Sequence, residues 1–112
     1  MKYLISFPAP AMIAPPEEMP AVGEAARKVI REAKAAGIYV FGGGINEGVT
    51  PLMVSAGGSF ESGTYPQTKE LNGGFCVLEL PSRDAAIKWA AKLAEACRCS
   101  QELREFHFDP ES

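Results

Sequence analysis

Three short segments of this chain carry large apolar side chains at both odd and even positions. They are residues 2–7 (KYLISF), 38–41 (IYVF) and 75–80 (FCVLEL). Because successive side chains of a strand point to opposite faces, such segments predict strands that are buried on both sides of a sheet. In the first segment, Tyr3, Ile5 and Phe7 are predicted to lie on one face and Leu4 on the other. In the second, Ile38 and Val40 are predicted to lie opposite Tyr39 and Phe41. In the third, Phe75 and Val77 are predicted to lie opposite Cys76, Leu78 and Leu80.

Two further segments have the apolar spacing of amphipathic helices. Residues 17–36 begin with the acidic pair of a helix N-terminus and stop at Gly37. The second helix follows Ser82, which is a favourable N-cap residue. The apolar stripes are Met19, Val22, Ala26, Val29, Ile30 and Ala33 in the first helix, and Ala86, Trp89, Ala90, Leu93 and Cys97 in the second.

The rest of the chain reads as loops and shorter strands. The proline-rich residues 8–16 and the polar residues 64–72 are expected to be loops, and Gly42–Gly44 to weaken or end the strand before them. Residues 52–55 and 59–62 flank a two-glycine turn and predict a hairpin, and residues 102–108 predict a last strand. The order predicts one domain over residues 1–112, a ferredoxin-like α+β sandwich in which the hairpin is inserted between two βαβ halves.

This architecture leaves one face of the sheet uncovered. Two helices can cover only one side, whereas the central strands are apolar on both. Burying one Phe or Leu side chain contributes about 1.5–3 kcal/mol, so several such residues are enough to drive association. We therefore expect a homodimer in which a second copy covers this face. The alternative is that the inserted hairpin folds over it within one chain.

Charge and cysteine content exclude several classes of function. The chain has 11 basic and 14 acidic residues and a net charge of −3, so no nucleic-acid footprint is expected. No apolar run approaches the length of a membrane span, and the first one ends at Pro8. Three cysteines without framework spacing favour a reducing, cytoplasmic location. Cys97 and Cys99 lack a second pair of ligands, so no metal site is expected, and Cys97 is predicted to be buried beside an exposed Cys99.

Two groups of side chains are candidates for a functional site. His107 is expected to share a strand face with Leu103 and Glu105, and a neighbouring carboxylate would suit a general base; the alternative is an exposed histidine on a terminal strand. In the loop 64–72, Tyr65, Lys69 and Glu70 offer an aromatic ring, a cation and an anion at the rim of a ligand site. The alternative is a solvated loop. Gly42–Gly44 match neither the phosphate-binding loop nor the dinucleotide fingerprint, and no cofactor is expected.

Residues 60–80 (FESGTYPQTKELNGGFCVLEL) and 83–96 (RDAAIKWAAKLAEA) resemble the YCII-related superfamily, in particular its DGPF branch. The opening MKYLISF and the segment AAGIYVFGGGI are similar to that branch as well, so the resemblance covers nearly the whole chain. It implies a dimeric ferredoxin-like fold of the α/β-barrel type, with a cleft near the subunit interface. Thr68-Lys69-Glu70 and Gly73-Gly74-Phe75 match the motifs of the branch.

The chain departs from the family pattern at two places. Ser62-Gly63-Thr64-Tyr65 stands where the branch has Asp-Gly-Pro-Phe, so the carboxylate of that turn is missing. The His–Asp pair of other YCII-type relatives has no counterpart, because the only histidine is His107. Resemblance transfers fold better than function.

Three functions remain open from the sequence. The first is a dimeric protein that binds a small polar molecule in an interface cleft lined by Tyr65, Lys69, Glu70 and His107. The second is a cofactor-independent enzyme that transfers a proton on a small carbonyl or lactone compound, with His107 as the base. The third is a regulatory interaction module.

Overall fold

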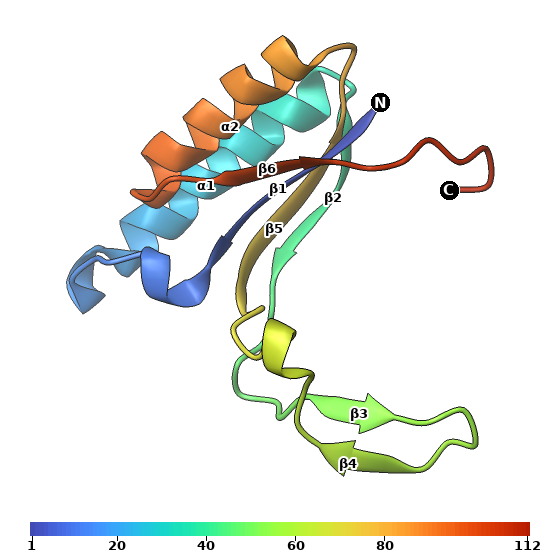
Figure 1. Ribbon diagram of the computed structural model, residues 1–112. Coiled ribbons are helices and arrows are strands. Elements are labelled where there is room, and N and C mark those ends of the chain that lie inside the picture. Colours follow the sequence, from blue (N-terminus) through green and yellow to red (C-terminus); the bar gives the residue numbers. More distant parts are fainter.

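The computed structural model describes residues 1–112 and consists of two layers with two extensions (Figure 1). A four-stranded antiparallel sheet has the strand order β2-β5-β1-β6, and two helices cover one of its faces. This mixed arrangement is compatible with the predicted ferredoxin-like α+β fold. The elements are β1 (Lys2–Pro8), α1 (Met19–Ala35), β2 (Tyr39–Gly44), β3 (Leu52–Val54), β4 (Phe60–Ser62), β5 (Gly73–Glu79), α2 (Arg83–Cys97) and β6 (Glu102–Glu105), with 3₁₀ turns at Ala9–Ala11, Pro16–Glu18 and Pro66–Thr68.

Residues at the ends of both helices account for where the helices begin and end. The α1 helix carries Pro20 in its first turn, where a missing N–H costs nothing, and it ends before Gly37, whose φ of 74° suits glycine. The Ser82 hydroxyl accepts a hydrogen bond from the Ala85 N–H at 3.2 Å, as predicted for the N-cap of α2. A 3.0 Å ion pair between Lys92 and Glu32 links the outer surfaces of the two helices.

The core lies between the helices and the inner face of the sheet. Tyr3 and Ile5 of β1 and Cys76 and Leu78 of β5 are buried there, as predicted. The helices add small or branched side chains, and Ala86 is fully buried where α2 approaches the sheet. The other members of the core are Val29, Ala33, Leu80, Ala90 and Leu93.

A bulge in β2 changes one of the predicted faces. Tyr39 pairs with Leu78, but Phe41 pairs with Val77, so one extra residue is accommodated between them. Tyr39 therefore lies on the helix side and Phe41 on the opposite side. The prediction that Tyr39 and Phe41 share a face was wrong, because a bulge reverses the alternation of side chains beyond it.

The strand β2 also continues further than expected. Gly42, Gly43 and Gly44 pair with Cys76, Phe75 and Gly74, so the glycines extend the strand rather than end it. Strand pairing supplies the hydrogen bonds that low strand propensity does not provide. The expectation that the three glycines would weaken or end the strand was wrong.

We call the face of the sheet opposite the helices the open face. Phe41, Phe75, Val77 and Leu4 lie on it, and no element of the same chain covers it (Figure 1). Phe41 is 64% exposed, although the apolar pattern predicts burial on both sides. Within a single chain the open face thus leaves apolar side chains of the sheet in contact with solvent.

The inserted hairpin does not close over the open face. β3 and β4 pair with each other as a separate two-stranded sheet, and Figure 1 shows them projecting from the end of the main sheet. We call residues 46–64 the arm. The connection between the strands is longer than the expected two-glycine turn: the Ser55 N–H donates to the Ser59 carbonyl oxygen at 2.8 Å, and Gly58 has a φ of 90°. The arm contributes to a radius of gyration of 15.6 Å, against about 13 Å for a compact chain of this length.

The last strand is shorter than predicted. β6 ends at Glu105, and residues 106–112 leave the sheet as a tail. One backbone bond from the Phe106 N–H to the Lys2 carbonyl oxygen, 3.0 Å long, marks the point of departure. The prediction of a strand to residue 108 was therefore wrong, and His107 does not share a strand face with Leu103 and Glu105.

Candidate functional site

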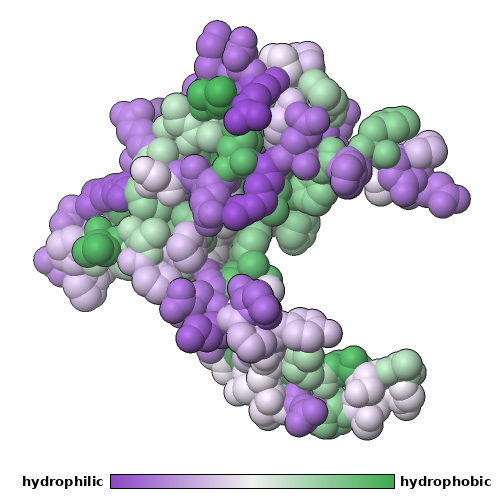
Figure 2. All heavy atoms as spheres, in the orientation of Figure 1, coloured by the Kyte–Doolittle hydropathy of each residue, from purple (hydrophilic) through white to green (hydrophobic).

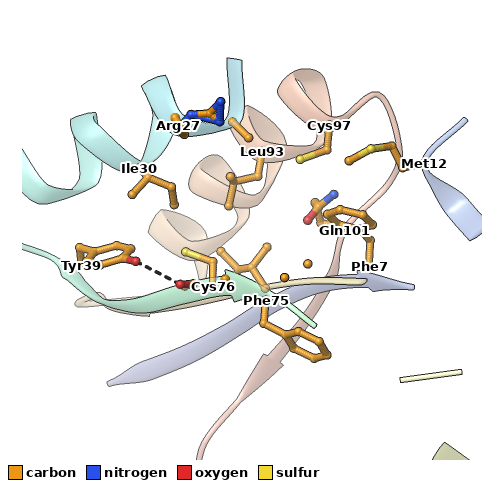
Figure 3. Close-up of a pocket in the computed structure, with 16 residues that line it drawn as sticks. Phe7, Met12, Arg27, Ile30, Tyr39, Phe75, Cys76, Leu93, Cys97 and Gln101 are labelled. Carbon is orange, nitrogen blue, oxygen red and sulfur yellow. Dashed lines mark hydrogen bonds between the residues drawn. The ribbon is translucent and has the colours of Figure 1, made fainter. Parts of the chain in front are cut away.

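A mostly apolar hollow lies between the helix layer and the glycine-rich end of the sheet (Figure 3). Its volume is about 370 Å³, which is within the usual range of small-molecule pockets. We call it the helix–sheet cavity. Sixteen residues line it: Ile5, Phe7, Met12, Ala26, Arg27, Ile30, Tyr39, Gly42, Gly43, Gly44, Gly74, Phe75, Cys76, Leu93, Cys97 and Gln101.

The cavity exists because β2 carries glycine where another strand would carry a side chain. Gly42 pairs with Cys76 and therefore faces the helices. A Cβ atom at Gly42 would lie 3.2 Å from both the Tyr39 hydroxyl oxygen and the Phe75 carbonyl oxygen. The space below α1 thus depends on glycine at this position. The glycine run follows the bulge between Tyr39 and Phe41, approaches the backbone of β5 closely at Gly42, and forms part of the cavity wall.

Three polar groups reach this mostly apolar cavity. The Tyr39 hydroxyl donates a long hydrogen bond, 3.5 Å, to the Gly42 carbonyl oxygen. The Gln101 amide nitrogen donates a hydrogen bond to the Cys99 carbonyl oxygen at 3.2 Å, and this bond fixes the position of the amide. Arg27 reaches the helix side of the cavity from α1, with its Nε 3.6 Å from a Glu24 carboxylate oxygen. Its side chain remains 62% exposed, so the guanidinium stands at the rim.

The thiols of the cavity are neutral under ordinary conditions. Burial raises the pKa of Cys76 to about 11. Burial, with a smaller contribution from Cys99, raises the pKa of Cys97 to about 11 as well. Both side chains therefore act as small apolar groups in the cavity wall rather than as nucleophiles. Cys97 is buried as predicted, and Cys99 is partly exposed.

The residues expected to form the site lie elsewhere, and not all together. Lys69 and Glu70 line a shallow hollow with Ala9, Glu47 and Asn72, near the Pro8 end of β1. Tyr65 begins the short turn Pro66–Thr68 that precedes them, and its ring is exposed. This part of the loop 64–72 is therefore a 3₁₀ turn rather than irregular structure.

His107 lies at the opposite end of β1. It lines a hollow in the tail with Lys2, Val77, Glu79 and Asp109, and it is exposed. The seven residues of β1 span roughly 20 Å at about 3.3 Å per residue. Within one chain, His107 and the Lys69–Glu70 hollow therefore do not form a common site.

The two hollows nevertheless border the same surface. A neighbouring hollow joins Glu70 and Leu71 to Leu4, Phe75 and Arg104 of the sheet. The hollow at His107 reaches Val77, which is also on the open face. Glu70 and His107 thus stand at the margins of the open face, at its two ends.

Sequence reasoning missed the helix–sheet cavity. Its lining residues come from β1, the segment after it, α1, β2, β5, α2 and the segment before β6, and their apolar character matches that of a packed core. The signal that was present is the run Gly42–Gly44 next to an apolar strand. No group of three or more His, Cys, Asp or Glu side chains gathers anywhere in the chain as a metal site. No helix combines the length and the hydropathy that crossing a bilayer requires.

The YCII-related domain family matches the chain over residues 1–105, which includes every strand and helix described above. A comparison with curated proteins gives no match. The family match agrees with the resemblance carried by Thr68-Lys69-Glu70 and Gly73-Gly74-Phe75. The chain is a member of the YCII-related family.

Proposed function

We propose that the protein is a homodimer that binds a small molecule with an apolar body and one anionic or hydrogen-bond-accepting group in the helix–sheet cavity. The observation that carries this proposal is the cavity of about 370 Å³, in which ten of the sixteen lining residues are hydrophobic. Ligand sites typically combine such a lining with a few placed polar groups. Here these groups are the Tyr39 hydroxyl, the Gln101 amide and the Arg27 guanidinium.

The polar groups indicate the chemistry of the ligand. A guanidinium binds planar anions such as carboxylates through paired hydrogen bonds. Arg27 stands at the rim, so the charged group of the ligand would remain close to water while the body enters the cavity. The neutral thiols of Cys76 and Cys97 and the side chains of Ile30 and Leu93 would contact that body. A polar molecule, the ligand class expected from the sequence, fits this lining less well than an amphipathic one.

The dimer is supported by the surface area of the single chain. Its accessible surface is 7887 Å², whereas a monomer of 12.0 kDa exposes about 6,000 Å² by the usual scaling with mass. The excess is on the order of 1,900 Å². A standard interface buries about 800 Å² per partner, and an obligate homodimer buries more. The chain therefore exposes the surplus that a large homodimer interface requires.

The open face is the natural centre of such an interface. Phe41 and Val40 on β2 are exposed, and Phe75 and Val77 on the central strand β5 are only half-buried. Face-to-face packing of two such sheets would give the dimeric barrel arrangement that the family resemblance implies. It would also enclose the hollow formed by Glu70, Leu71 and Phe75. This hollow is our candidate for the interface cleft expected from the sequence, and it is a second possible ligand site beside the helix–sheet cavity.

The ligand proposal is tested by thermal unfolding with octanoate and with 1-octanol, which have the same chain length and differ in the head group. We expect octanoate to raise the melting temperature more than 1-octanol. Ala26→Leu, which places a larger side chain in the cavity, should abolish both shifts. Ala21→Leu on the exposed side of α1 is the matched control and should retain them.

The role of Arg27 is tested separately. Arg27→Gln should reduce the effect of octanoate to that of 1-octanol, whereas Lys28→Gln, one residue further along α1, should leave the difference intact. If neither compound stabilises the wild-type protein, or if Ala26→Leu leaves the shifts unchanged, the cavity is not the binding site.

The dimer is tested by sedimentation velocity at about 10 µM protein. We expect a species of about 24 kDa, twice the mass of the chain. Phe41→Asp, which introduces a charge on the β2 side of the open face, should shift the equilibrium to monomer because an unpaired buried charge is costly. A wild-type species of single-chain mass would overturn this part of the proposal.

A further inference from the structure

The arm has one apolar face and nothing in its own chain to pack against. Val54 pairs with Phe60, and Leu52 pairs with Ser62, so these side chains share one side of the two-stranded ribbon. Val54 is 68% exposed and Phe60 is 67% exposed. The opposite side carries Met53 and Glu61. The ribbon is therefore amphipathic, and its apolar side faces solvent in the single chain.

Such a ribbon is not stable by itself. Each strand of the arm has only three residues, and an isolated two-stranded hairpin is at best marginally stable in water. It needs a surface that covers its apolar side. Figure 1 shows that the core of the same chain lies away from the ribbon, so this surface must come from another molecule.

The arm also bounds the open face. Figures 1 and 2 show the arm and the tail extending from opposite ends of the sheet, with a bay between them. A copy that covered the open face would occupy this bay and would lie directly beside the arm. The shape of the chain therefore selects a second copy as the molecule that the arm contacts.

A comparison of the area of the open face with the surplus accessible surface also indicates that the arm belongs to the dimer interface. Four strands at a spacing of about 4.8 Å and seven residues at about 3.4 Å give the open face a footprint of roughly 450 Å². This is far below the surplus of about 1,900 Å² derived from the scaling with mass. An interface restricted to the open face would leave much of the surplus exposed, including the apolar side of the arm.

We propose that the arm is a dimer clasp: the apolar face formed by Leu52, Val54 and Phe60 packs against the partner subunit, and each subunit holds the other in this way. The inference rests on the dimer proposed above and adds the arm to its interface. By twofold symmetry each dimer contains two identical arm contacts, so one substitution removes both. The glycines at the tip and the base of the arm, Gly58 and Gly63, have positive φ angles and set its turns.

The test compares three substitutions that each add one negative charge to the arm. Val54→Asp and Phe60→Asp place it on the apolar face, and Ala56→Asp places it at the exposed tip. The dimer dissociation constant is measured by sedimentation equilibrium. We expect Val54→Asp and Phe60→Asp to weaken the dimer by about 100-fold or more, since two contacts are lost at once. Ala56→Asp should change it by less than about threefold.

Both the dimer and the clasp have outcomes that would overturn them. A monomeric wild-type protein would remove the dimer and the clasp together. The clasp alone would be contradicted by a different result. In that case the wild type is a dimer and Phe41→Asp dissociates it, but Val54→Asp and Phe60→Asp have the same dimer dissociation constant as Ala56→Asp. Hydrogen exchange provides a second readout: amides of residues 52–62 should become more protected as the protein concentration rises through the dissociation constant, and concentration-independent exchange would contradict the clasp.

Discussion

The backbone carbonyl group of Phe7 occupies the space in which a Cβ atom of Gly73 would lie. Gly73 has a φ of 139°, and its ideal Cβ position is also 2.8 Å from the Ala9 nitrogen. The contact closes the end of the β1–β5 ladder, where the Ala9 N–H donates to the Asn72 carbonyl oxygen at 2.8 Å. Gly74 is similarly confined, since its Cβ would lie 2.6 Å from the Phe7 ring. The Gly-Gly-Phe motif thus has a structural basis in the close approach of two strands.

Gly73→Ala should destabilise the protein. The left-handed backbone conformation alone costs a non-glycine residue about 1–3 kcal/mol, and the backbone of Phe7 must also move. We expect urea unfolding to show a lower midpoint with an unchanged slope. Gly57→Ala in the turn of the arm is the control, because its Cβ has no neighbour within 4 Å. Equal midpoints for the two variants would show that the β1–β5 ends can separate at no cost.

Leu78→Ala should be the most damaging truncation in the core. Leu78 is 0% exposed and lies in the middle of β5. Buried Leu-to-Ala substitutions cost about 2–5 kcal/mol, with the larger values where the surroundings cannot collapse. Ile87→Ala on α2, where the side chain is half exposed, should cost less than about 1.5 kcal/mol. Chemical denaturation of both variants measures the difference, and similar losses would contradict the assignment of the core.

Ser82→Ala should remove the N-terminal cap of α2. Its hydroxyl accepts from the Ala85 N–H, and loss of such a cap costs about 0.5–2 kcal/mol. Ser82→Asp keeps an acceptor and places a negative charge at the positive end of the helix, so it should retain most of the stability. Thermal unfolding distinguishes the two. A Ser82→Ala protein as stable as Ser82→Asp would mean that solvent satisfies the helix end equally well.

Stability should decrease in alkaline solution because of the buried thiols. Burial raises the pKa of Cys76 from its ordinary value of 9.0, which applies to the unfolded chain, to about 11 in the folded protein. Between these values the unfolded chain loses the proton and the folded chain keeps it, so the free energy of unfolding falls as pH rises from 9 to 11. The slope is about 1.4 kcal/mol per pH unit for one thiol. Below pH 9 both states are protonated and this contribution is constant.

Cys76→Ala measures this contribution. Urea unfolding at pH values of about 8, 9 and 10 should show a shallower decrease for Cys76→Ala than for the wild type. Cys99→Ala, at a partly exposed position, should follow the wild type more closely. Parallel curves for the wild type and Cys76→Ala would indicate that the Cys76 thiolate is solvated in the folded protein.

Local sequence pattern was sufficient for the elements of the fold. The alternation in residues 75–80, the helical stripe ending at Gly37 and the cap at Ser82 each depend on neighbours a few residues apart, and the structure confirms them. The same reasoning failed at the bulge between Tyr39 and Phe41 and at the end of β6. At both places the register and the length of the strand depend on how many residues of the neighbouring strand are available for pairing. The neighbouring strand is distant in the sequence.

The sequence by itself determined that this chain forms a sheet with apolar residues on both faces and two helices for one of them, because the periods of strands and helices are local properties. Only the tertiary structure decided where the candidate sites lie. It opened a cavity above Gly42, kept His107 at the far end of β1 from Lys69 and Glu70, and directed the arm away from the open face. These placements result from strand register and chain direction, which couple residues that the sequence keeps far apart.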